Sequence, residues 1–126
     1  MIIIDSDIVI DVLRKHRPAL TWMNAQPSAV LISGFSAIEV FAGCRDTAQQ
    51  RSVDAMLKGL RVVWPSTARC NFALNNFRSL RLSHGIGALD TLIAQTAIEL
   101  NLALHTFNVK HFQHILGLQT IQPYTR

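Results

Sequence analysis

The chain has few charged residues, only two cysteines and no long apolar run. Charged residues make up 16% of its 126 residues and hydrophobic residues 49%, a balance that excludes an intrinsically disordered protein. Its apolar runs are far shorter than the roughly 20 residues that a transmembrane helix needs. Met1 leads directly into Ile2–Ile4 without a basic segment or cleavage site, so we expect no signal peptide. Cys44 and Cys70 lack CxxC spacing and predict free thiols, and hence a soluble, cytoplasmic protein.

Acidic residues are also scarce. The chain has eight aspartates and glutamates against twelve lysines and arginines, which gives a net charge of +4 and a pI near 9.7. This excess suits a nucleic-acid or acidic-protein partner, although many basic proteins bind neither. The basic residues are dispersed, and only Arg14, Lys15 and Arg17 form a tight cluster.

The few acids are unevenly placed, because three of the eight lie in the stretch Ile2–Asp11. Asp5, Asp7 and Asp11 are embedded there among branched aliphatic residues. A solvated acidic patch would not contain so many Ile and Val side chains, and a plain core strand would not contain Asp. These carboxylates therefore either cap a helix or are held at the edge of a core for chemistry.

Strand patterns alternate with helix patterns along the chain, without a linker or repeat. Apolar runs predict strands over 2–4, 29–32, 60–63, 102–106 and 118–121. Helical periodicity and capping residues predict six helices. The first begins at residue 6, the second begins at residue 18 and the third ends at residue 42. The other three span 46–58, 66 to about 82 and 88–101, and a further helical turn begins at 108. We expect one domain over residues 1–126, an α/β fold in the form of a three-layer α/β/α sandwich with a mainly parallel sheet.

In such a fold the carboxyl ends of the strands share one edge, where ligands bind. Asp5 ends the first strand and Asn108 follows the fourth. Glu39 and Asp90 lie in the first turns of helices that start from the same edge. Although these four residues are spread over the whole chain, the topology predicts that they meet.

Helix capping is the alternative explanation for each of them. Asp5 or Ser6 can cap the first helix, and Ser36 with Glu39 fits a capping box. Asp90 favours the helix dipole. Two details favour a shared site. Glu39 is the only charge between residues 17 and 45, and Asp90 falls on a small apolar helical face, away from a polar row formed by Thr91, Gln95 and Glu99.

Three carboxylates that converge at a partly buried edge repel one another and raise their own pKa values. A divalent cation removes this penalty. Because all the ligands are oxygens, Mg²⁺ or Mn²⁺ is the expected ion, with water and a phosphate oxygen completing its coordination.

Three separated stretches, "IIIDSDIVIDVLR", "SAIEVFAGC" and "ALDTLIAQTAIELNLALHTFNVKHF", carry a resemblance to a known family. Their order and spacing resemble the PIN-domain ribonucleases, and closely the VapC toxins of bacterial toxin–antitoxin systems. The resemblance covers essentially the whole chain. It implies a homodimeric, Mg²⁺- or Mn²⁺-dependent endoribonuclease that cleaves tRNA or rRNA and is neutralised by a cognate VapB-like antitoxin.

The resemblance also assigns roles to single residues. It implies that Asp5, Glu39 and Asp90 form the acidic triad. Many relatives carry a fourth acid where this chain has Asn108. Ser6 and Thr106 match hydroxyl positions that orient ligands or water.

The remaining polar residues of these stretches have less specific roles. Asp7 starts the first helix and is a candidate for the outer shell of the site. Asp11 is one helical turn from Lys15 and is expected to pair with it in solvent. Arg14, Arg81 and Lys110 are candidates for contacts with RNA phosphates.

Competing patterns remain open. Asp5 to Val9 fits DxDx[TV], the signature of haloacid-dehalogenase-type phosphatases, with Asp5 as nucleophile and Asp7 as acid, but the expected downstream lysine and paired acids are missing. His105, His111 and His114 could suggest zinc, but their spacing and context favour surface or supporting roles. An apolar stripe is more typical of a core or dimer surface than of a base-stacking platform: Trp64, Phe72, Leu74, Phe77 and Leu80. A non-catalytic RNA-binding module is the third alternative.

Overall fold

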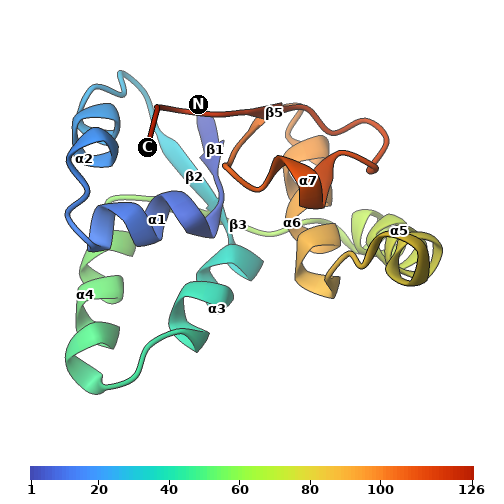
Figure 1. The fold of residues 1–126 in the computed structure, drawn as a ribbon, viewed down its shortest axis with the longest axis horizontal. Coiled ribbons are helices and arrows are strands. Elements are labelled where there is room, and N and C mark those ends of the chain that lie inside the picture. The colour runs from blue at the N-terminus through green and yellow to red at the C-terminus, as the bar shows by residue number, and fades with distance from the viewer.

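The computed structural model describes all 126 residues as a five-stranded sheet with helices on both faces (Figure 1). The strand order is β3-β2-β1-β4-β5, and every neighbouring pair is parallel. The strands are β1 (Ile2–Ile4), β2 (Val30–Ser33), β3 (Arg61–Val63), β4 (Leu104–His105) and β5 (Thr120–Ile121). The prediction of a mainly parallel sheet is confirmed, and the sheet is in fact entirely parallel.

Seven helices connect and flank the strands. They are α1 (Ser6–Leu13), α2 (Arg17–Asn24), α3 (Gly34–Ala42), α4 (Thr47–Leu57), α5 (Thr67–His84), α6 (Ala88–Glu99) and α7 (Val109–Phe112). Each had been predicted from the sequence, and the differences are confined to helix ends. None of these helices combines the length and the apolar character needed to span a membrane.

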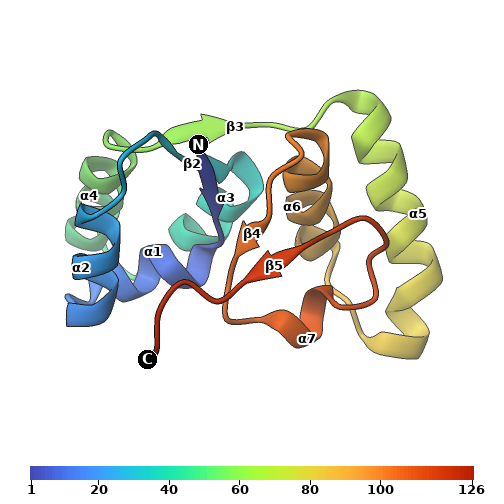
Figure 2. The same cartoon turned by 90° about the horizontal axis from the view of Figure 1, so that it is seen from above.

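The sheet separates two hydrophobic cores, which makes the fold a three-layer sandwich (Figure 2). Side chains alternate across a strand, so Ile3 and Ile4 enter different cores. Ile3 packs with α6 and with Phe112, the last residue of α7. Ile4 packs with residues of α1, α3 and α4, including Val40. Because both faces are covered, the strands are continuous aliphatic runs.

Helix α6 differs from the prediction in one respect. Thr91 and Gln95, two members of its polar row, are buried because α5 packs across that face. The Gln95 amide donates to Asn76 Oδ1 on α5 at 2.8 Å. Glu99 alone stays exposed, and it accepts hydrogen bonds from the backbone N–H and the hydroxyl of Ser66 at the start of α5.

Candidate active site

Asp5 lies at the carboxyl end of β1 and is only 3% exposed. One carboxylate oxygen accepts the backbone N–H of Ser6 at 2.7 Å and so caps α1. The other accepts the Thr106 hydroxyl at 2.9 Å. Capping and a place in a buried polar site are therefore two roles of the same side chain.

Glu39 lies beside Asp5, on the far side of the Ser6 hydroxyl. The Ser6 Oγ is 3.5 Å from Asp5 Oδ1 and 3.2 Å from Glu39 Oε1, so one hydroxyl bridges two carboxylates. The alternative of a capping box at Ser36 is wrong. Helix α3 begins at Gly34 and is capped by Ser33, which places Ser36 inside the helix.

Asp90 approaches the same edge from the first turn of α6. Its Oδ2 accepts the backbone N–H of Gly87 at 3.3 Å, and His111 Nδ1 lies 3.6 Å from it. Asp90 keeps 19% of its side chain exposed, against 61% for His111. The contact with His111 went unpredicted, although its position three residues after Asn108 placed it near this edge.

The segment after β4 ties Asp7 into the site. Asp7 Oδ2 accepts the Phe107 backbone N–H at 2.8 Å and lies 3.3 Å from the Thr106 hydroxyl. The Thr106 oxygen in turn accepts the backbone N–H of Asn108 at 3.0 Å. Asp7 Oδ1 is buried without a hydrogen-bond partner. Asn108 itself is exposed and caps α7 without a side-chain hydrogen bond.

Burial raises the pKa values of three of these acids, and neighbouring carboxylates add to the shift for two of them. Burial, followed by the charge of Asp7, raises the pKa of Asp5 to about 7. Burial also raises the pKa of Asp7, despite hydrogen bonds from backbone N–H groups. The pKa of Glu39 is raised by burial and further by the charges of Asp90 and Asp7. Without a counter-charge, this edge of the sheet disfavours ionised carboxylates.

The donor chemistry fits a hard divalent cation. Asp5, Glu39 and Asp90 offer carboxylate oxygens at one edge, and the buried, unpartnered oxygen of Asp7 adds acceptor capacity beside them. As the side chains stand, no three His, Cys, Asp or Glu residues are close enough together to hold a metal ion. Binding therefore requires the less buried side chains, Glu39 and Asp90, to turn toward Asp5.

The histidines do not converge, which removes the zinc alternative. His105 packs against Trp22 with ring centroids 5.4 Å apart, and burial lowers its pKa. His111 faces Asp90. His114 instead stacks on His84 at a centroid distance of 3.8 Å.

The three predicted phosphate contacts occupy different places around the site. Arg14, at the end of α1, lines a cleft that also contains Glu39. Lys110 is exposed on α7, beside His111. Arg81 lies in the last turn of α5, with its guanidinium 5.9 Å from the Phe77 ring, and contacts none of the acids.

The prediction for Asp11 is wrong. Asp11 is 8% exposed and does not pair with Lys15. Its carboxylate accepts the Tyr124 hydroxyl at 2.7 Å and the Arg126 guanidinium at 3.0 and 3.2 Å. The chain after β5 runs back across the molecule to α1 (Figure 2), and Arg126 also lies 4.2 Å from the Phe107 ring centroid. Asp11 thus anchors the C-terminal segment.

We expect Asp11→Asn to lower the free energy of unfolding by about 1–2 kcal/mol. Hydrogen bonds to a charged group are worth about 1.5–3 kcal/mol, and solvent screening reduces this because 47% of the Arg126 side chain is exposed. Urea unfolding measures the loss. Lys15→Gln is the matched control and should change stability by less than about 0.5 kcal/mol. Equal losses of stability in the two variants would indicate that Asp11 pairs with Lys15 after all.

Comparison with known proteins places the chain in a family. The model of the PIN domain matches residues 2–115, so the chain belongs to the PIN domain family. This removes the phosphatase alternative. The chain is 37% identical to Ribonuclease VapC10 of Mycobacterium tuberculosis over 115 residues, which cover 89% of this chain and 86% of that protein.

Solved structures of toxin–antitoxin complexes share the fold. A toxin–antitoxin complex from Klebsiella pneumoniae matches with a TM-score of 0.74 at 25% identity, covering 100% of both chains. VapBC2 from Rickettsia felis, bound to a DNA fragment from its promoter, gives 0.75 at 26% identity and covers 96% of this chain and 98% of that one. VapBC-1 from nontypeable Haemophilus influenzae gives 0.72 at 26% identity, with coverage of 96% and 97%. The three-layer fold is thus that of VapBC-type complexes.

Proposed function

We propose that residues 1–126 form one PIN nuclease domain, a VapC-like toxin that cleaves tRNA or rRNA in the cytoplasm and is neutralised by a cognate VapB-like antitoxin. One observation carries the proposal. Asp5 and Glu39, 34 positions apart in sequence, share the Ser6 hydroxyl at an edge where burial and the charge of Asp90 raise the pKa of Glu39. The likeness to Ribonuclease VapC10 and to the toxin–antitoxin complexes supports it.

Asp5, Glu39 and Asp90 would hold a Mg²⁺ or Mn²⁺ ion, which supplies an activated water and stabilises charge on the scissile phosphodiester. Thr106 fixes the Asp5 carboxylate by donating to its Oδ2, and Ser6 sets the spacing of Asp5 and Glu39. Asp7 keeps the segment after β4 in place through the Phe107 N–H. We assign Asn108 to the orientation of Thr106, and Arg14, Arg81 and Lys110 to RNA phosphates.

Metal binding should stabilise the fold. Burial raises the pKa values of Asp5, Asp7 and Glu39, and neighbouring carboxylates add to the shifts of Asp5 and Glu39, so the ionised carboxylates gain from a nearby cation. A cation that binds only the folded state raises the free energy of unfolding by mass action, by about 2.7 kcal/mol at one hundred times its Kd, and Tm rises with it. Differential scanning calorimetry with millimolar Mg²⁺ or Mn²⁺ measures the shift, and Asp90→Asn should reduce it. No shift with either ion, or a full response to Zn²⁺ alone, would contradict the proposed site.

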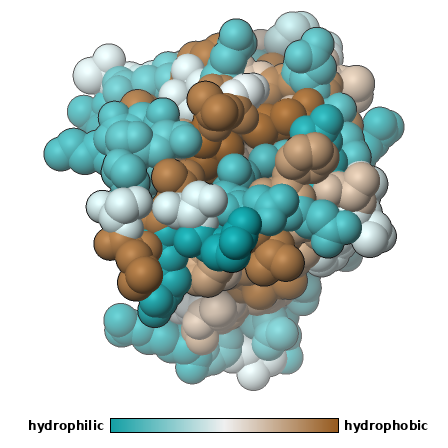
Figure 3. Space-filling view, turned by 90° about the vertical axis from the view of Figure 1, so that its right-hand side faces the viewer, coloured by the Kyte–Doolittle hydropathy of each residue, from teal (hydrophilic) through white to brown (hydrophobic).

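We further propose that the chain is a homodimer. Several large apolar side chains are exposed, among them Trp64 (57%), Phe72 (54%) and Leu74 (63%). Figure 3 shows hydrophobic side chains among polar ones on the face of the molecule that carries α5. Exposed apolar area of this kind marks association surfaces. Multi-angle light scattering should give twice the 14.1 kDa of one chain, and a monomer throughout the micromolar range would remove the claim.

A further inference from the structure

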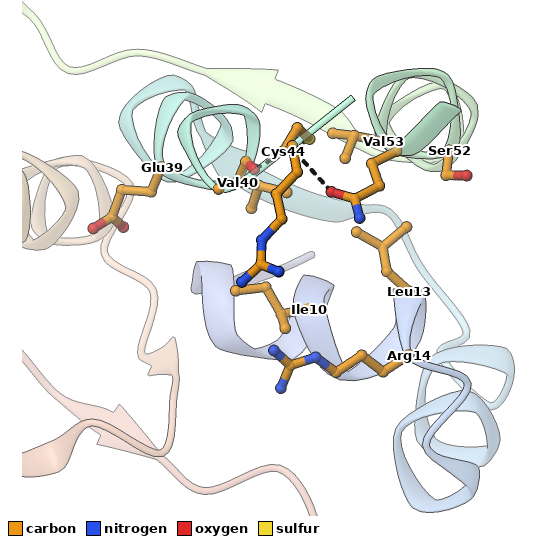
Figure 4. Close-up of a pocket in the computed structure, with 11 residues that line it drawn as sticks. Ile10, Leu13, Arg14, Glu39, Val40, Cys44, Ser52 and Val53 are labelled. Carbon is orange, nitrogen blue, oxygen red and sulfur yellow. Dashed lines mark hydrogen bonds between the residues drawn. The ribbon is translucent and has the colours of Figure 1, made fainter. Parts of the chain in front are cut away.

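A cleft of about 540 Å³ opens between α1, α3 and α4 (Figure 4). Glu39 lies at one end of it and Ser52 at the other. Its apolar lining includes Ile10, Val40 and Val53. Because Glu39 belongs both to this cleft and to the proposed acidic triad, a molecule in the cleft lies directly beside the reacting centre.

Two cations on the cleft are unsatisfied. Arg14 and Arg45 both line it, and neither guanidinium forms a salt bridge or a hydrogen bond. Figure 4 shows the Arg14 side chain running back along α1, with its guanidinium beside Ile10. Arg45 is fixed at the backbone, since its N–H donates to Gln49 Oε1 at 2.8 Å. Glu39 is the only acid in the lining, so the rest of the cleft favours an anion.

We propose that this cleft is a nucleotide subsite of the RNA substrate, adjacent to the scissile phosphodiester. The proposal rests on the nuclease function above. Arg14 and Arg45 bind the phosphate of one nucleotide, for which paired guanidinium forks are suited. Its base lies on the aliphatic side chains of Ile10, Val40 and Val53.

The dimensions and the polar groups of the cleft fit an unstacked nucleotide. Its volume falls in the usual range of small-ligand pockets, about 300–1,000 Å³, which combine apolar walls with a few polar groups. Sequence-specific RNA recognition commonly splays single bases out of the stack. The amide nitrogen of Gln49 forms no hydrogen bond within the protein and is available to a base edge. Gln49 is thus the residue assigned to base preference.

Differential alkylation of the two cysteines tests occupancy. Cys44 lines the cleft, whereas Cys70 lies on α5, and both thiols are free and partly exposed. An Asp5→Asn chain with Mg²⁺ and a fluorescein-labelled single-stranded RNA decamer of mixed sequence keeps the RNA intact. Once anisotropy registers binding, mass spectrometry should find that RNA slows iodoacetamide modification of Cys44 at least about threefold and leaves Cys70 unchanged. Bound RNA with unchanged rates at both cysteines overturns the subsite alone, and no RNA binding overturns both the subsite and the nuclease function.

Salt dependence tests the arginines. Each phosphate contact on a single strand contributes about 0.7 to the slope of log Kd against log salt. Because Arg14 and Arg45 bind one phosphate, the double variant Arg14→Gln/Arg45→Gln should lower the slope by about this amount, and each single variant should lower it by less. The matched control is Arg61→Gln, which removes an exposed arginine at the amino end of β3. Unchanged slopes, or variants that weaken only capture of an acidic antitoxin segment, would assign the cleft to a protein partner and overturn the proposal.

Discussion

Asp5→Asn should abolish RNA cleavage while leaving the fold intact. Asn caps helices as well as Asp does, so the hydrogen bond from the Ser6 N–H to the side chain can persist. The carboxylate charge that would hold the cation is lost. We expect a fall in cleavage rate of more than about a hundredfold, beyond the effect of outer-shell residues. A gel assay with purified protein measures it, and circular dichroism checks the fold.

Asp46→Asn is the matched control for this substitution. Asp46 caps α4 by accepting the Gln49 N–H at 2.8 Å, so the same change is made at another helix start. Its cleavage rate should stay near that of the wild type. Asp7→Asn should be intermediate, since Asn still accepts the Phe107 N–H and an outer-shell role is worth about tenfold to a hundredfold. Full ribonuclease activity in Asp5→Asn would show that the site is misplaced.

Metal-free protein should lose stability as the pH rises from about 4 to 8. The pKa of Asp5 is about 7 in the folded protein, against 3.8 for the unfolded group, so the folded state retains a proton that the unfolded state releases. The contribution of Asp5 is fully present below pH 3.8 and disappears as the pH passes 7. Each unit of pKa difference is worth about 1.4 kcal/mol, so the loss is a few kcal/mol.

Urea unfolding in EDTA across this pH range measures the effect. Asp5→Asn has no group to titrate at this position and should give a flatter profile, whereas Asp46→Asn should follow the wild type. Saturating Mg²⁺ should restore stability above pH 7, because the cation replaces the proton as the counter-charge. A free energy of unfolding that rises between pH 4 and 8 in the metal-free wild type would contradict the placement of Asp5 as a buried acid without a cation beside it.

The placement of Asp5, Glu39 and Asp90 could be predicted because it follows from topology. Parallel strands direct their carboxyl ends to one edge, and strand and helix patterns were strong enough to locate each acid relative to it. Asn108 followed from the same rule, whereas Thr106 was assigned by the resemblance to the PIN-domain ribonucleases. Within this set, sequence patterns sufficed because each residue is defined by its position in a local element.

Contacts between distant elements could not be predicted in this way. The pattern of its own helix predicts that Asp11 is exposed, yet Tyr124 and Arg126 reach it from 113 and 115 positions away. Thr91 and Gln95 belong to a polar row in the sequence pattern of α6, but in the structure they are buried because α5 packs against them. The cleft beside Glu39 likewise depends on how α1, α3 and α4 pack together. The hydrophobic periodicity of a single helix does not predict that packing.

Sequencing of RNA 5′ ends after incubation with the purified chain tests the central claim most directly. With Mg²⁺ or Mn²⁺, the wild-type protein should produce new internal ends at a small set of sites in tRNA or rRNA. EDTA and Asp5→Asn should each remove these ends, and Asp46→Asn should keep them. Absence of new ends with either metal, or the same ends from Asp5→Asn, would contradict a metal-dependent endoribonuclease centred on this carboxylate.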